Sequence, residues 1–410
     1  WSSDVCSSDL EGSLLFGTRY VSEAQGSDWL QRNLLVDQQT EPFLTLLDGD
    51  TIDVEIGGGS YHELGYTAVD AYGRDLETNV SAAIDEDGQR LVYTVSDAMG
   101  NTATASRSIR YVDTTPPLVT LTGGEEYHIP VGVDYVEPGF TAVDNSDGDV
   151  TESVQVSGTV DQYKVGVYPI SYTVSDSKGN SGTVIRNVYR DPQEIPEDPS
   201  SLDKVIYLTF DDGPAMYTEE LLDILDIYGV KVTFFVTAQF PDYLDMIGEE
   251  YRRGHSVAIH SYTHDFAIYA SEETYFDDLN AMQDVIREQT GQETRLVRFP
   301  GGSSNTISAN YCRGIMTALA NDLEDMGYQY FDWNVSSGDA GSTTDTHQVY
   351  ENVINDITGN GAEPNVVLQH DIKDFSIAAV EDIILWGLEN GYTFLPLNVT
   401  SPTAHHGISN

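Results

Sequence analysis

An internal repeat in the N-terminal half constrains the fold of this chain more than any other feature of its sequence. The hexapeptide GYTAVD at Gly65–Asp70 returns as GFTAVD at Gly139–Asp144. The segment YTVSDAMGN at Tyr93–Asn101 returns as YTVSDSKGN at Tyr172–Asn180. Because the two segments return in the same order and at nearly the same spacing, we expect one structural unit to be present twice.

Each copy has the residue pattern of a small β-sandwich. Both copies open with a P-x-x-T-L segment, at Pro42–Leu46 and Pro117–Leu121, and continue in short runs of alternating Val, Ile, Tyr and Thr. Glycine, aspartate and asparagine interrupt these runs, and Gly100 and Gly179 stand where a turn requires a positive φ. This pattern is typical of antiparallel strands packed in two sheets.

These features resemble the bacterial immunoglobulin-like repeats of surface and secreted proteins. The resemblance implies two all-β immunoglobulin-like sandwiches, at residues 40–114 and 115–190. The proline-rich, acidic segment 191–201 is then expected to be a stiff linker. Residues 11–39 stay unassigned, with a remnant of a preceding repeat as one interpretation. We expect residues 1–10 (WSSDVCSSDL) to be a sequencing-adapter scar, with the true N-terminus outside this sequence.

After Leu202 the pattern changes to alternating strands and helices. The apolar strand candidates are 205–210, 231–237, 256–259, 295–299, 328–335, 365–369 and 393–397. Between them, helical spacing of apolar residues is clearest at 219–228 and 274–289. Strands that alternate with helices predict a parallel α/β sheet, here a deformed (β/α)7 barrel over residues 202–400, followed by a tail at 401–410.

Polar residues gather where the predicted strands end, which is where barrel enzymes carry their chemistry. His260 and His264 are four residues apart, so a helical turn would place both rings on one side. Two imidazoles and one carboxylate make a three-ligand site that suits one divalent metal ion, zinc first, with cobalt or nickel as alternatives. Two histidines alone could equally cap a surface loop, but the carboxylates of Asp211 and Asp212 at a neighbouring strand end favour the metal site.

Asp211 and Asp212 are adjacent and cannot easily bind one metal ion from the same extended backbone. One carboxylate is therefore expected to face the metal and the other the reacting water. An ordinary Asp-Gly-Pro turn would explain Gly213 and Pro214, but it would not explain the second carboxylate.

The motifs TFDDGP, HSYTH, RFPGG and LQHD together resemble those of the NodB-homology polysaccharide deacetylases, carbohydrate esterase family 4. The resemblance covers nearly the whole C-terminal half and implies that Asp212, His260 and His264 hold the metal. The other roles that it implies are general base for Asp211, general acid for His370, tuning of the base for Arg298, oxyanion binding by the backbone N–H of Gly301, an acetyl pocket lined by Leu368, and a place in the substrate groove for Pro300.

The chain departs from this family in one motif, which usually reads D-x-x-S-x-D-W. The best match here runs from Asn334 to Ala340, so the first Asp is Asn and the terminal Trp is Ala. By the resemblance, Asp339 is the partner of His370. Trp333 either replaces the missing wall of the substrate groove or belongs to the core.

The charge balance narrows the classes of partner. The chain has 67 acidic and 19 basic residues, a formal net charge of −48. Such a surface repels nucleic acid and anionic lipid, and the sequence contains no apolar run long enough to cross a membrane. We expect an extracellular or cell-surface protein whose partner is an acetylated polysaccharide, with the repeats as a spacer or a means of cell-wall association.

The sequence therefore predicts a metal-dependent hydrolase that removes N-acetyl groups from N-acetylglucosamine, with peptidoglycan as the first candidate substrate. Chitin, an exopolysaccharide or acetylated xylan are alternatives within the same chemistry. A non-catalytic surface adhesin with a degenerate deacetylase domain is the alternative from another class.

Overall fold

A computed structural model of the chain describes residues 40–58, 60–196, 199–360 and 364–409. The expectations for residues 1–10 and 11–39 lie outside the described residues. Within the described residues, no helix is both long enough and apolar enough to span a membrane.

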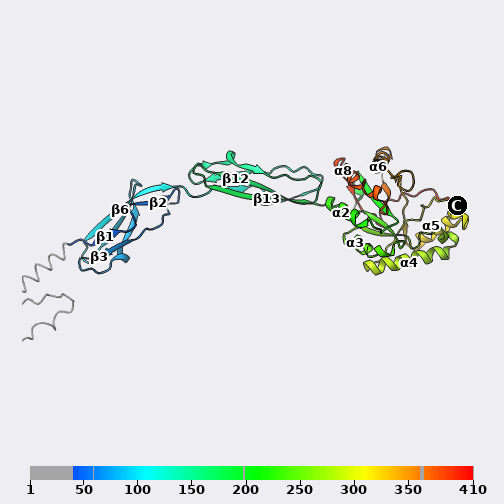
Figure 1. The fold of residues 1–410 in the computed structure, drawn as a ribbon, viewed down its shortest axis with the longest axis horizontal. Helices are drawn as coiled ribbons and strands as arrows, with labels where there is room; N and C mark the ends of the chain where they lie inside the picture. The colour runs from blue at the N-terminus through cyan, green and yellow to red at the C-terminus, as the bar shows by residue number, and fades with distance from the viewer. Residues whose placement is uncertain (1–39, 59, 197–198, 361–363, 410) are drawn as a thin grey trace, which may run out of the picture. The chain divides into compact units, whose positions relative to one another are not determined.

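The first repeat forms a four-stranded sheet and a two-stranded sheet (Figure 1). Its strands are β1 Phe43–Leu46, β2 Thr51–Glu55, β3 Tyr66–Val69, β4 Ser81–Ile84, β5 Arg90–Ser96 and β6 Thr102–Val112. The larger sheet has the order β2-β6-β5-β4, and β1 pairs with β3. Alternate residues of β5, namely Leu91, Tyr93 and Val95, are buried, as the period of two predicts.

The second repeat follows the same plan. Its strands are β7 Leu118–Leu121, β8 Glu126–Pro130, β9 Phe140–Asp144, β10 Gly148–Asp149, β11 Gln155–Ser157, β12 Gly166–Ser175 and β13 Ser181–Asp191. The four-stranded sheet has the order β11-β12-β13-β8 and the three-stranded sheet the order β10-β9-β7.

One pairing in each repeat differs from the purely antiparallel sandwich that the sequence predicts. β2 pairs with β6, and β8 pairs with β13, in parallel. In each case an early strand of the repeat lies beside its last strand at one edge of the larger sheet. Alternation of apolar residues is the same in parallel and antiparallel edge strands, so the sequence pattern could not distinguish them.

The C-terminal half is built on an eight-stranded sheet in which every recorded pairing is parallel. Its strands are β14 Val205–Asp211, β15 Thr233–Thr237, β16 Ser256–Ser261, β17 Leu296–Val297, β18 Gln329–Tyr330, β19 Val335–Ser336, β20 Asn365–His370 and β21 Thr393–Phe394. The order is β18-β17-β16-β15-β14-β20-β19, and β21 also pairs with β14. All seven residues of β14 are buried, because the strand lies in the middle of the sheet with neighbours on both sides.

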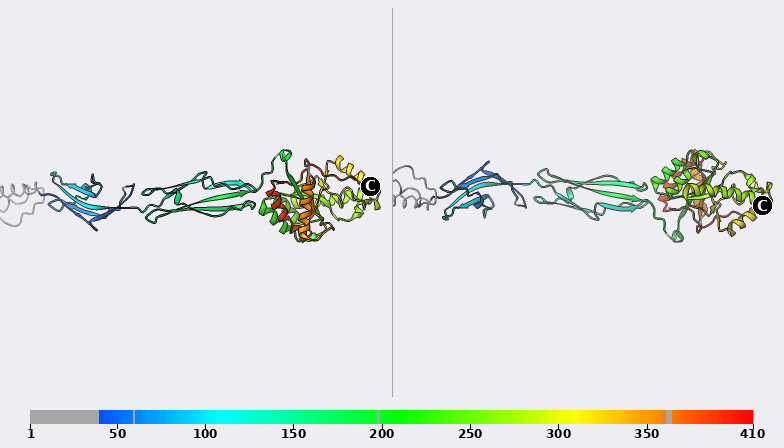
Figure 2. Two further views of the ribbon diagram at one scale, coloured as in Figure 1. Left: turned by 90° about the horizontal axis from the view of Figure 1, so that it is seen from above. Right: turned by 90° about the horizontal axis from the view of Figure 1, so that it is seen from below.

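Helices surround this sheet, as Figures 1 and 2 show. They are α2 Thr218–Tyr228, α3 Met246–Arg252, α4 Glu272–Thr290, α5 Ile315–Asp325, α6 Thr346–Asn360, α7 Asp374–Ile377 and α8 Val380–Glu389. The two helices that were clearest in the sequence, 219–228 and 274–289, are confirmed as α2 and α4. Ser271 begins α4 with a capping box, and Gly291 ends it at φ 73°.

The strand expected at 328–335 is wrong, because the structure divides this segment into β18 and β19. These two strands are the opposite edges of the seven-strand path, so the sheet curls as an incomplete barrel and stays open between them. Residues 331–334 connect the two edges. The carbonyls of Phe331 and Asp332 accept hydrogen bonds from the Arg298 guanidinium instead of from a neighbouring strand.

Candidate active site

The end of β14 carries the two adjacent carboxylates. Asp211 is the last residue of the strand and Asp212 follows it at φ 77°, a left-handed conformation that side chains other than glycine seldom adopt. The hydroxyl of Thr237 donates a hydrogen bond to the Asp212 carbonyl at 2.7 Å and holds this turn. A Cβ on Gly213 would lie 2.0 Å from an Asp371 carboxylate oxygen, so the next position accepts only glycine.

The end of β16 carries the two histidines. His260 lies inside the strand, and His264 lies in the loop that follows, at φ 52°. The helical turn expected from the four-residue spacing is therefore wrong. The two rings still meet, with centroids 5.1 Å apart, because the loop doubles back on the strand end.

Asp278 of α4 holds this loop, a role that sequence reasoning missed. Its buried carboxylate accepts hydrogen bonds from the backbone N–H groups of Tyr262 and Thr263 and from the hydroxyls of Ser261 and Thr263, all at 2.7–2.9 Å. Ser261 also accepts the backbone N–H of His264. An aspartate inside the apolar face of a predicted helix was the available signal.

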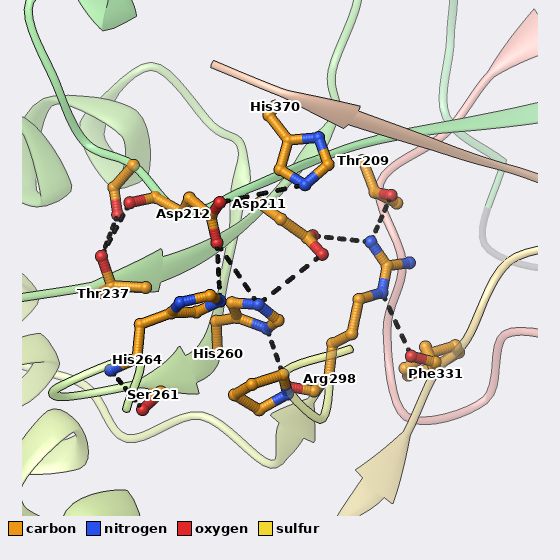
Figure 3. Close-up of polar contacts among 12 residues, drawn as sticks. Thr209, Asp211, Asp212, Thr237, His260, Ser261, His264, Arg298, Phe331 and His370 are labelled. Carbon is orange, nitrogen blue, oxygen red and sulfur yellow. Dashed lines mark hydrogen bonds and ion pairs between the residues drawn. The ribbon is translucent and has the colours of Figure 1, made fainter. Parts of the chain in front are cut away.

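Asp212, His260 and His264 come together as the sequence predicts (Figure 3). One ligand atom from each lies within 4.8 Å of the other two. The Asp212 oxygen Oδ1 is 3.2 Å from His264 Nε2 and 3.5 Å from His260 Nε2, and it is buried without a hydrogen-bond partner among the described residues.

The chemistry of these three side chains fits a divalent metal ion. Burial lowers the pKa of His260 to about 3, so its ring is neutral at physiological pH. Its Nδ1 donates to the carbonyl of Arg298 at 2.9 Å, which leaves the Nε2 lone pair directed toward Asp212. An unpartnered carboxylate oxygen and two imidazoles are the donor set of an open zinc-type site.

Asp211 faces the opposite side, toward Arg298, which is fully buried. The guanidinium donates to the Asp211 carboxylate and to the Thr209 hydroxyl, both at 2.7 Å. Burial raises the pKa of Asp211, and the positive charge of Arg298 offsets part of that rise. Its second oxygen lies 3.9 Å from His260 Nε2, so Asp211 borders the candidate metal site without the short contacts that Asp212 makes.

His370, the last residue of β20, stands across from this pair, with Nε2 3.9 Å from the Asp212 carboxylate. Its Nδ1 is 2.8 Å from one oxygen of Asp339. The other Asp339 oxygen accepts the backbone N–H of His370 and the hydroxyl of Ser376. Burial lowers the pKa of His370, but the hydrogen bond and the charge of Asp339 outweigh it and the net shift is upward.

The remaining predicted site residues lie along the same rim. The Pro300 carbonyl accepts from the Tyr269 hydroxyl at 2.9 Å, and Gly301 adopts φ 77° where a Cβ would press on Phe266 and Asn305. Leu368 is buried in β20 beside Thr209 of β14.

Trp333 is half-buried, and its surroundings are those of a core residue. Its ring lies against the Arg298 guanidinium and meets the ring of His406 edge-on, with centroids 4.7 Å apart. His406 also donates its backbone N–H to Asp332 at 2.8 Å, and His405 stacks on Tyr330. Residues expected to form a tail thus contact the catalytic half, a contact that no sequence pattern indicated.

Asp371, the residue after His370, has a structural place against the turn at Gly213. It is fully buried, burial raises its pKa to about 7, and the Thr218 hydroxyl donates to it at 2.6 Å.

Together, the strand ends therefore offer a carboxylate–imidazole metal site, a carboxylate held by arginine, and a histidine held by a carboxylate. This set can activate a water molecule on one side of a bound carbonyl and protonate a leaving group on the other.

Comparison with known proteins finds family matches in both halves of the chain. A family model described as polysaccharide deacetylase matches residues 198–320, and one described as a bacterial surface protein, Ig-like domain matches residues 119–189. The match confirms the immunoglobulin-like resemblance for the second repeat, whereas the same assignment of the first repeat stays a prediction.

Individual proteins match the C-terminal half. The chain is 34% identical over 198 residues to the peptidoglycan-N-acetylglucosamine deacetylase of Bacillus cereus, an alignment that covers 47% of this chain and 68% of that protein. The chain also matches the crystal structure of the catalytic domain of peptidoglycan N-acetylglucosamine deacetylase from Eubacterium rectale. The two sequences are 55% identical and the TM-score is 0.49, and the match covers 52% of this chain and 100% of the Eubacterium rectale chain. The resemblance stated from the sequence motifs is thus confirmed, and the chain belongs to the polysaccharide deacetylases of carbohydrate esterase family 4.

Proposed function

We propose that this chain is a metal-dependent hydrolase that removes N-acetyl groups from N-acetylglucosamine residues of a cell-wall or extracellular polysaccharide, with peptidoglycan as the first candidate. The observation that carries the proposal is the meeting of Asp212, His260 and His264 beside Asp211, with His370 opposite. The relatives named as peptidoglycan N-acetylglucosamine deacetylases support this choice of substrate.

Asp212, His260 and His264 would hold the metal ion, zinc first among the candidates. A bound ion would supply Lewis-acid chemistry, polarising the acetyl carbonyl and lowering the pKa of the attacking water molecule. Asp211 takes the proton of that water, since its carboxylate borders the ligands and keeps one oxygen free of Arg298.

His370 donates a proton to the departing amine. Asp339 holds it by its Nδ1, so that Nε2 points toward the ligand group and the protonated form is stabilised. The backbone N–H of Gly301 is the proposed oxyanion donor, and Leu368 with Pro300 would line the acetyl group.

Association with the cell surface is the location that we propose, on the strength of the Ig-like match at residues 119–189. In this arrangement the repeats space the catalytic half from the surface to which the chain is attached. The acidic surface then contacts a neutral or amino-bearing glycan more readily than an anionic one.

The test is acetate release by the purified, zinc-loaded full chain from three substrates: peptidoglycan, hexa-N-acetylchitohexaose and acetylxylan. We expect release from the N-acetylated glycans and none from acetylxylan. Asp211→Asn should keep its zinc by elemental analysis and lose turnover, whereas Asp212→Ala should lose both. The proposal fails if the loaded wild-type chain releases acetate from neither peptidoglycan nor hexa-N-acetylchitohexaose, or if Asp212→Ala retains zinc as well as the wild type.

A further inference from the structure

Three buried aspartates meet outside the catalytic half. Asp113 follows β6, Asp144 ends β9 and Asp176 follows β12. One carboxylate oxygen from each lies within 4.8 Å of the other two. The three residues are only 8%, 4% and 8% exposed, so their charges are largely removed from water.

Three oxygens of this aspartate cluster are buried without hydrogen-bond partners among the described residues. They are both oxygens of Asp113 and one oxygen of Asp144. The other oxygens are used to fix the carboxylates in place. Asp144 accepts the backbone N–H groups of Ser146 and Asp147, and Asp176 accepts the backbone and side-chain N–H groups of Asn180. The cluster is therefore held in place on two sides, at Asp144 and at Asp176.

Among the residues that the structure describes, no positively charged side chain forms an ion pair with the cluster. None of the ion pairs formed by the described residues includes Asp113, Asp144 or Asp176. Burial and the negative charges of Asp144 and Asp176 raise the pKa of Asp113, whereas hydrogen bonds from Asn180 and its neighbours keep the pKa of Asp176 low despite burial. Buried carboxylates without a partner are costly, and a bound cation removes that cost.

The first repeat provides an internal comparison. Its equivalents of Asp144 and Asp176 are Asp70 and Asp97, in the repeated segments of the sequence. Asp70 pairs with Arg74, and neither Asp70 nor Asp97 has a buried oxygen without a partner. The position that corresponds to Arg74 in the second repeat is Gly148. An arginine thus pairs with one of the two aspartates in the first copy, whereas the second copy lacks that arginine and Asp113 adds a third carboxylate.

We propose that Asp113, Asp144 and Asp176 form a calcium-binding site. All the available ligand atoms are carboxylate oxygens, with neither histidine nor cysteine among them, which favours a hard cation over zinc. Calcium accepts six to eight oxygens in flexible geometry, so three aspartates and additional water can complete its shell, whereas magnesium requires a near-ideal octahedron. The ion links the segment after β6 to the two turns that follow β9 and β12.

Isothermal titration of CaCl2 into the full chain tests the site directly, with one equivalent of zinc present to occupy the catalytic half. We expect one calcium ion per chain, with a dissociation constant of about 10⁻⁶–10⁻³ M. Asp113→Asn and Asp144→Asn should each weaken binding at least tenfold. Asp97→Asn, the matched change in the first repeat, should leave it unchanged.

Thermal unfolding of the same proteins shows whether Asp113 acts as a calcium ligand or only as a structural carboxylate. Without calcium, Asp113→Asn should melt at the same temperature as the wild type or higher, because it removes one of three repelling charges. With calcium it should melt lower, because it lacks a ligand. The proposal is overturned if Asp113→Asn lowers the melting temperature equally in both buffers, if millimolar calcium gives neither heat nor stabilisation, or if magnesium binds as tightly as calcium.

Discussion

Replacing Asp339 with asparagine tests the half of the active site in which this chain departs from its family's motif. The Asp339 carboxylate accepts from His370 Nδ1 on one oxygen, and from the His370 backbone N–H and the Ser376 hydroxyl on the other. In asparagine, only the side-chain carbonyl oxygen can accept the two hydrogen bonds that come from the His370 backbone N–H and the Ser376 hydroxyl. Its NH2 group must then face His370 Nδ1, which forces the neutral tautomer with the proton on Nε2 and removes the acid form of the ring.

The size of the effect follows from the interaction that is lost. A hydrogen bond to a charged group contributes about 1.5–3 kcal/mol, and each 1.4 kcal/mol corresponds to a factor of ten. Asp339→Asn should therefore lower kcat by about 10- to 150-fold and leave KM nearly unchanged, because the residue does not touch the substrate. Ser376→Ala removes one neutral hydrogen bond from the same carboxylate, worth about 1 kcal/mol, and should lower kcat by no more than about tenfold.

Acetate release from hexa-N-acetylchitohexaose by the zinc-loaded full chain is the assay for both variants. Zinc content by elemental analysis and circular dichroism should match the wild type, so that a loss of kcat is assigned to the acid and not to the metal site. A kcat within threefold of the wild type for Asp339→Asn would refute the role of Asp339 as the partner of His370.

Two further predictions concern residues away from the chemistry. Asp278→Ala removes the four hydrogen bonds that hold residues 261–263 and should lower zinc affinity by about 10- to 100-fold in competition with a chelator, an effect that Asp277→Ala on the same helix should lack. Burial lowers the pKa of His255 to about 3 from an ordinary 6.5, so between these pH values the unfolded chain binds one more proton than the folded chain, and the free energy of unfolding decreases as the pH is lowered from 6.5 to 3. His255→Asn should flatten that dependence by up to about 1.4 kcal/mol per pH unit in urea titrations, whereas exposed His347→Asn should not. An unchanged slope for His255→Asn would contradict the lowered pKa of His255, and unchanged zinc affinity for Asp278→Ala would contradict the role of Asp278 in holding the loop.

The parts of the fold that the sequence predicts are those with a local periodic signal. β14 is a continuous apolar run and α4 a long amphipathic stretch, and both lie where they were expected. The prediction of one strand at 328–335 failed because the segment is rich in aromatic residues, which favour strands, although its central carbonyls bond to Arg298, a residue distant in the sequence. Long-range hydrogen bonding of this kind leaves no periodic trace.

More of the site than of the fold could be predicted, because the site residues stand at strand ends and parallel strands bring their carboxyl ends to one edge of the sheet. That argument brings Asp211, Asp212, His260 and His370 together without knowledge of their backbone angles. It could not identify Asp278, whose function depends on the path of a loop, or His406, whose contacts form only after the chain returns to the catalytic half. Nor could it show that the two histidines meet through a doubled-back loop.

Backbone strain coincides with the proposed metal ligands. Among the described residues, three that are not glycine have positive φ, namely Asp48, Asp212 and His264, and two of these are proposed ligands. The left-handed conformation costs roughly 1–2 kcal/mol for a side chain other than glycine, so this part of the chain holds its ligands at the expense of stability. The neighbouring Asp211 ends a regular strand and makes its contacts without such strain.

A matched pair of variants measures this cost. Asp212→Ala and Asp212→Gly both remove the carboxylate, but only glycine relieves the strain at φ 77°. The greater freedom of glycine in the unfolded chain offsets about 0.4–1 kcal/mol of the relief. In urea unfolding of the metal-free proteins, Asp212→Gly should therefore be more stable than Asp212→Ala by about 0.5–1 kcal/mol, the reverse of the order expected at a helical or extended position. If alanine proved as stable as glycine there, the backbone at Asp212 would not be strained, and the site's geometry would have to be maintained by the ligands alone.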